Sequence, residues 1–177
     1  MASTTTALDI TIQLLLSGTY QGAGQLNIPG EQIGYPSSAP KSTRYTLGTG
    51  SGQANFKLDR VLSLVSATPQ SLDLVAGVTG APADVFGQTC NLASIKLFAI
   101  GNRSTTTAQT VTITGNAVTT GAIFGSVTNI VLQPSEFKLL LNSPVDGKTL
   151  TAGTADTVTF TSNANFDMDV FILGIQI

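Results

Sequence analysis

The chain has 177 residues and a formal net charge of −2, and charged residues make up only 10% of it. A chain of this length fits one domain with an ordinary hydrophobic core. Its eight lysines and arginines are scattered singly, which excludes the concentrated positive footprint of a nucleic-acid-binding protein. The polar content comes from Thr, Ser, Asn, Gln and Gly, and abundant β-branched Thr favours strands over helices.

The N-terminal part is predicted to be one strand followed by a long extension. The pattern alternates from Asp9 and becomes apolar on both faces by Leu16, which indicates a strand over 9–16. Residues 17–52 then hold eight glycines, three prolines and all three tyrosines. A segment of this length without regular structure is uncommon in a compact domain and tends to be functional.

Residues 1–55 are therefore expected to form the first strand and an extended arm. One interpretation of the arm is a surface excursion without a partner. The alternative, which we favour, is an arm ordered on a neighbouring subunit, because interfaces are enriched in tyrosine. The contact residues expected for this arm are Tyr20, Ile28, Ile33, Tyr35 and Tyr45.

Short β-rich runs separated by turn residues fill 56–177. We expect strands near 56–65, 70–75, 92–100, 108–115, 129–132, 137–141, 157–161 and 168–177. Many short strands at such spacing are typical of a sandwich or barrel. The prediction is a single all-β domain, an antiparallel jelly-roll-like β-sandwich with a long Gly/Pro-rich N-terminal arm.

The last run, 168–177, is apolar at nearly every position. A strand of this kind is covered on both faces. One face, beginning with Met168, can turn toward the sandwich interior. The other face needs a second cover, supplied by loops, by the arm or by a neighbouring subunit, and its expected contact residues are Phe171, Leu173 and Ile175.

The residue inventory bounds the chemistry. The chain contains no histidine, which excludes imidazole catalysis and most metal triads, and Cys90 is its one cysteine, which excludes an intramolecular disulfide. The first residues lack a basic segment, and no apolar run reaches the roughly 18 residues of a membrane span. We expect a non-enzymatic protein with no cofactor, metal, small-molecule substrate or membrane partner, made in a reducing compartment.

Asp167 and Asp169 are the closest pair of carboxylates in the sequence. Residues i and i+2 of a strand share a face, so the two could converge on one cation or one proton, with Asp156 expected on the preceding strand. No further oxygen ligand has the spacing of a known calcium loop. The simpler interpretation is that both carboxylates solvate the start of the last strand.

Several runs of the chain resemble small virion proteins of tailed bacteriophages. They are 70–75 (QSLDLV), 84–87 (DVFG), 91–102 (NLASIKLFAIGN), the turn 133–136 (QPSE), 151–158 (TAGTADTV) and the closing ILGI of the last strand. The first turn has Pro134-Ser135 where that family has Pro-Gly-Gly. The resemblance covers about residues 56–177 and does not extend to the arm.

The resemblance implies a β-sandwich component of the phage particle, most simply a capsid decoration, or cement, protein on the outside of the head. It implies a homotrimer that contacts the major capsid protein and stabilises the contacts between capsomers. Such a protein is made in the host cytoplasm and ends on the virion surface. The alternative is a tail- or fibre-associated sandwich that recognises host polysaccharide, although the chain has no tryptophan for sugar stacking.

Overall fold

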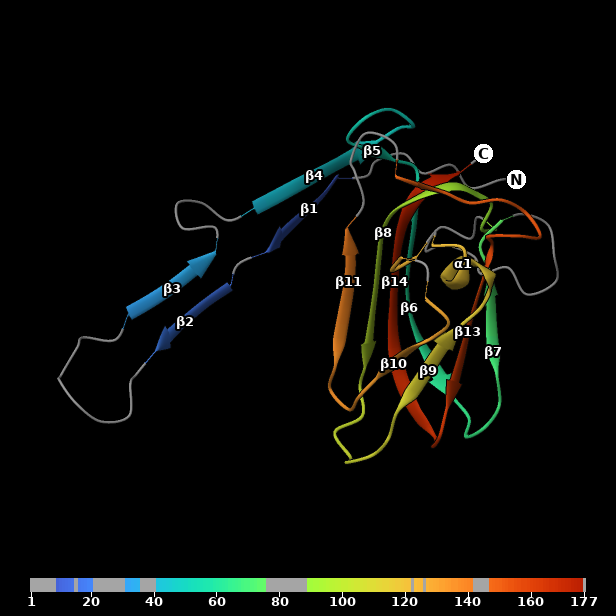
Figure 1. Cartoon of the computed structure of the whole chain (residues 1–177). Coiled ribbons are helices and arrows are strands. Elements are labelled where there is room, and N and C mark those ends of the chain that lie inside the picture. The colour runs from blue at the N-terminus through green and yellow to red at the C-terminus, as the bar shows by residue number, and fades with distance from the viewer. Residues whose placement is uncertain are drawn as a thin grey trace.

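The computed structural model of the chain describes residues 9–14, 16–20, 31–35, 41–75, 89–121, 123–125, 127–141 and 147–176. Strands dominate these residues, and Figure 1 shows their arrangement. The strands are β1 (Asp9–Leu14), β2 (Leu16–Tyr20), β3 (Glu31–Tyr35), β4 (Lys41–Leu47), β5 (Gln53–Ala54), β6 (Phe56–Leu64), β7 (Gln70–Asp73), β8 (Leu92–Asn102), β9 (Val111–Thr114), β10 (Ile130–Leu132), β11 (Phe137–Leu141), β12 (Lys148–Thr149), β13 (Thr157–Ser162) and β14 (Phe166–Gln176).

Helical structure in the described part of the chain is limited to one turn, α1 (Asn116–Thr119). It packs beside β13, where the Asn116 side chain accepts hydrogen bonds from the backbone N–H groups of Asp156 (2.8 Å) and Thr157 (2.7 Å). No helix among the described residues is long and apolar enough to cross a membrane.

Nine strands from residue 56 onward form the body as two antiparallel sheets. Their orders are β11-β8-β14-β6, with β12 added beside β8, and β10-β9-β13-β7. Strands that follow each other in the chain hold the same rank in the two sheets: β6 with β7, β14 with β13, β8 with β9, and β11 with β10. Two four-stranded sheets connected in this way make a jelly roll, which confirms the predicted fold class.

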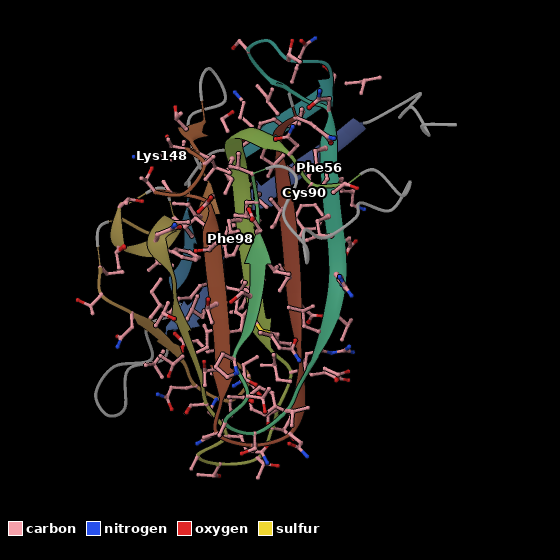
Figure 2. All side chains as sticks on the ribbon, turned by 90° about the vertical axis from the view of Figure 1, so that its right-hand side faces the viewer. Phe56, Cys90, Phe98 and Lys148 are labelled. Atoms are coloured by element: carbon pink, nitrogen blue, oxygen red, sulfur yellow. The ribbon has the colours of Figure 1, made fainter. Side chains whose placement is uncertain are left out.

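The core lies between the two sheets because each strand turns alternate residues inward. In β13, Val158, Phe160 and Ser162 are buried while the threonines between them are partly exposed. Seven strands of the body, β6 to β10, β13 and β14, contribute buried apolar side chains to one continuous cluster. Leu140 of β11 is only partly buried and packs at the margin of this cluster. Phe56, Cys90 and Phe98 belong to this cluster and can be followed in Figure 2.

The part of the arm that the structure describes is more regular than the sequence predicts. Instead of one strand followed by an irregular extension, residues 9–54 contain five strands. β1, β4 and β5 form a three-stranded sheet, and β2 and β3 form a separate two-stranded sheet. The expectation of an irregular arm is wrong for these strands, because pairing with a distant partner overrides the Gly and Pro content that the local pattern emphasises.

The arm sheets stand beside the jelly roll rather than inside it. Figure 1 shows β1 and β4 leaving the end of the body near β5, and β2 and β3 lying farther out. Leu14 pairs with Lys41 in the antiparallel β1–β4 ladder, so the chain between them leaves and returns at one point. The β2–β3 ladder is therefore an outward loop of the chain that begins and ends at this pair.

Candidate partner-binding surface

The sheet β11-β8-β14-β6 has an outer face, turned away from the second sheet, whose residues are aligned by the strand register. Rows of paired residues run across the sheet from β11 to β6, and three neighbouring rows form the middle of this face. The first row is Leu141, Leu97, Leu173 and Lys57; the second is Leu139, Ala99, Phe171 and Asp59; the third is Phe137, Gly101, Asp169 and Val61. This face is apolar where it crosses β11 and β8 and becomes charged toward β6.

Burial on this face falls steeply from the first row to the third. Leu97 and Leu173 are almost fully buried, whereas Leu139 is 37% exposed, Val61 46% and Phe137 61%. We call Phe137, Leu139 and the half-buried Phe171 the exposed strip. Val61 lies on β6 at the other edge of the sheet, and Asp169 stands between it and Phe137 in the third row. Clustered exposed apolar side chains of this kind mark interaction sites more often than isolated ones do.

The Phe137 ring has a defined seat on the sheet. It lies over Gly101 of β8, where an added Cβ would stand 3.4 Å from the ring and 3.7 Å from an Asp169 carboxylate oxygen. Because Gly101 has no side chain, the ring and the carboxylate approach it from opposite sides. The glycine thus makes room for an aromatic ring that the rest of the face does not cover.

The turn that leads into β11 is held firmly against its neighbours. The Ser135 N–H donates to the Ser104 carbonyl at 2.8 Å, and the Asn102 N–H donates to the Glu136 carbonyl at 2.9 Å. Glu136 also accepts a hydrogen bond from the Gln133 N–H at 2.7 Å. These bonds fix the backbone immediately before Phe137, so the exposed ring is carried by a rigid element.

Ionic and polar contacts border the exposed strip on the β14 and β6 side. Lys57 lies 3.3 Å from Asp59 and 5.5 Å from the centre of the Phe171 ring, a cation–π distance. Asp169 lies 3.8 Å from Arg103, and Asp167 accepts a hydrogen bond from Ser63 at 2.8 Å. An apolar centre with a polar margin is the usual composition of a protein interface.

The first row of the same face is already covered by the arm of this chain. Tyr45 of β4 is fully buried in a cluster with Leu97, Ala99 and Leu173, and Phe171 packs against it. The Tyr45 hydroxyl is buried and has no hydrogen-bond partner among the described residues, and burial raises the pKa of the phenol. The second cover that the sequence demands for the last strand is thus supplied, at this row, by the N-terminal arm.

The predicted contact residues fall into three groups. Tyr45 and Leu173 lie inside the chain's own arm–sheet contact and are not on the surface, because β4 folds back over this row. Phe171 and Ile175, both on β14, are half-buried. Tyr20 lies on β2, Ile33 and Tyr35 lie on β3, and Ile28 lies outside the described residues.

The alternative interpretation of the carboxylates, convergence on one cation or proton, does not match the described residues. Asp167 and Asp169 share the outer face of β14 as expected, but each has its own polar neighbour, Ser63 and Arg103. Asp156 lies just before β13, at the opposite end of that strand from the turn that leads into β14. There it is buried and accepts a 2.7 Å hydrogen bond from Asn116. Within the described ranges, no three His, Cys, Asp or Glu side chains stand close enough to hold a metal ion.

Phe137 and Leu139 were not predicted as contact residues. The sequence did contain a signal, because β11 is apolar on both faces in the same way as the last strand: Leu140 packs toward the core while Phe137 and Leu139 point outward. What the sequence could not give was the rank of β11 at the sheet edge. That rank leaves its outer residues uncovered.

The fold and the surface together define the class of this protein: a jelly-roll β-sandwich that carries an exposed apolar strip on one sheet and a stranded N-terminal arm. Comparison with protein-family models, with curated proteins and with solved structures gives no match to the chain.

Proposed function

We propose that this chain is a structural protein of a bacteriophage particle, a decoration protein that binds the outside of the head and stabilises the contacts between capsomers. The observation that carries the proposal is the exposed strip on the outer face of the β11-β8-β14-β6 sheet. The sequence resemblance described above gives the phage context. The jelly roll is compatible with it, since viral capsid and lectin domains use this fold, although a fold alone does not assign a function.

The strip suits a surface that is normally covered. A Phe side chain moved from water to an interface contributes about 1.5–3 kcal/mol, so leaving Phe137 at 61% exposure forgoes much of that stabilisation in the isolated chain. The rigid backbone before Phe137 means that little ordering entropy is lost when a partner covers the ring. In the proposed assembly the partners are the major capsid protein and neighbouring copies, with a homotrimer as the working arrangement on the virion surface.

The test is occupancy on purified heads of the phage that encodes the chain. Heads freed of the protein are incubated with the wild type, with Phe137→Asp, and with Val131→Asp as the matched control. Val131 lies on β10, in the other sheet, and is 41% exposed, so it receives the same charge change at similar exposure. Bound protein is quantified by mass spectrometry against the major capsid protein.

We expect the wild type and Val131→Asp to saturate the heads, and Phe137→Asp to bind roughly 10- to 100-fold more weakly, as the loss of one buried aromatic implies. Absence of the protein from purified particles would contradict the proposal. A glycan array run with the same three proteins tests polysaccharide recognition. Binding to a specific sugar, together with absence from the head, would favour the tail- or fibre-associated alternative.

A further inference from the structure

The two-stranded sheet of β2 and β3 lacks the support that such a sheet normally needs. The two strands pair over five residues each, from Leu16 with Tyr35 to Tyr20 with Glu31, and the described part of the chain gives neither of them a third strand. An isolated two-stranded sheet is at best marginally stable in water. Figure 1 shows the pair lying away from the body. A second surface is needed to hold it.

Within one chain, the arm already contacts the outer face of the β11-β8-β14-β6 sheet. Tyr45 of β4 packs against Leu97 and Leu173 of the first row and against Ala99, the β8 residue of the second row. The exposed strip continues that same face by one and two rows, through Phe171 and Leu139 to Phe137. The uncovered surface is therefore the direct continuation of an arm–sheet contact that already exists. Within one chain, however, β2 and β3 extend outward and leave the strip open.

We propose that the β2–β3 pair of one copy lies across the exposed strip of a second copy of this chain. Such a contact would support the two-stranded sheet and cover Phe137 in one step. The sequence of the pair suits this surface: β2 and β3 together hold one charged residue, Glu31, and include Tyr20, Ile33 and Tyr35. Aromatic and aliphatic residues with few charges are typical of the centre of an interface.

The contact is heterologous, because the arm of one copy meets the sheet of the next, and a different surface is used on each side. Heterologous contacts form a closed ring when the rotation between copies allows it. The inference deepens the proposed function and rests on it, since it names the surface through which copies associate. Its test uses the isolated protein in solution, so that its failure and the failure of head binding can be told apart.

The first variant removes the arm pair without disturbing the rest of the arm. Because Leu14 and Lys41 are directly opposite in the β1–β4 ladder, residues 15–40 can be replaced by an Asn-Gly turn that closes β1 and β4 as a hairpin. A point variant, Ile33→Asp, changes β3 and keeps the chain length. Phe137→Asp disables the strip, and Val131→Asp is again the control.

Light scattering and sedimentation then give the mass of each protein over a range of concentrations, with circular dichroism confirming that each is folded. The wild type and Val131→Asp should form the same oligomer. The trimmed arm, Ile33→Asp and Phe137→Asp should each dissociate, with the dissociation constant raised roughly 10- to 100-fold for the point variants. A monomeric wild type would overturn the inference without touching head binding. An oligomer that survives arm trimming would do the same, because it would show sheet-to-sheet contact.

A mixing experiment decides the direction of the contact. The trimmed-arm protein retains an intact strip, and Phe137→Asp retains an intact arm, so an equal mixture should yield a 1:1 heterodimer although neither protein associates alone. Contact between two strips, or between two arms, gives no heterodimer. Failure of the mixture to associate therefore overturns the proposed arm-to-strip arrangement.

Discussion

Tyr45 offers a direct measure of how strongly the arm is held against the jelly roll. Its ring is fully buried between β4 and the outer face of the β11-β8-β14-β6 sheet, and its hydroxyl lacks a hydrogen-bond partner in the part of the chain that the structure describes. Leaving a buried hydroxyl unpaired costs about 1–3 kcal/mol. Removing the hydroxyl in Tyr45→Phe should therefore increase the free energy of unfolding by about 1 kcal/mol, which for a chain of this size raises Tm by about 2–4 °C.

Tyr45→Ala tests the ring itself. Truncation of a buried aromatic residue costs about 3–5 kcal/mol, and the lower end applies here because β4 belongs to a surface arm that can settle into the space. A loss of about 3 kcal/mol lowers Tm by roughly 6–12 °C. The two variants are compared by thermal and urea unfolding, and hydrogen exchange shows whether β4 loses protection before the body does.

The result that would refute this reasoning is a Tyr45→Phe protein less stable than the wild type by 1 kcal/mol or more, since the hydroxyl would then have a partner in solution. The pH dependence gives a second check. Burial raises the pKa of Tyr45 above its ordinary value of 10.0. The contribution of the neutral phenol to the free energy of unfolding is therefore complete below about pH 10 and is lost as the pH rises through the folded-state pKa. Tyr45→Phe should lack this part of the alkaline loss.

Three further outcomes follow from the body. Asn116→Ala removes the acceptor of two partly buried N–H groups at the start of β13 and should lower stability by about 2–4 kcal/mol in urea unfolding. Gly174→Ala would place a Cβ 2.6 Å from the Ser94 carbonyl oxygen, so a soluble variant with unchanged Tm would contradict the close approach of β14 and β8. The hydrogen bond from Lys138 lowers the pKa of Glu136 below its ordinary 4.5, so its stabilisation is present above that pH and is lost as the pH falls through the lowered pKa. Glu136→Gln should accordingly flatten the fall of Tm on acidification, while equal acid sensitivity in both proteins would argue against this bond.

The fold could be predicted from the sequence to a large extent because its signals are local. Alternation in 111–114 and 157–162, and the turn residues between the runs, identify strands without knowledge of their partners. The arm was harder. β3 and β4 lie among glycines and prolines, and their pairing with β2 and β1 joins residues up to 37 positions apart, such as Asp9 with Thr46. No local pattern carries that information.

The cover of the last strand could likewise be predicted only in part. The sequence by itself determined that the last strand needs cover on both faces after Asp169, since residues 170–175 include no polar side chain to turn toward water. Only the tertiary structure decided what covers each row, because cover depends on which strand lies beside which. The arm returns to bury Leu173 under Tyr45, while the edge position of β11 leaves Phe137 open. A sequence records how apolar a strand is, and the order of strands in the sheet decides which of its residues meet water.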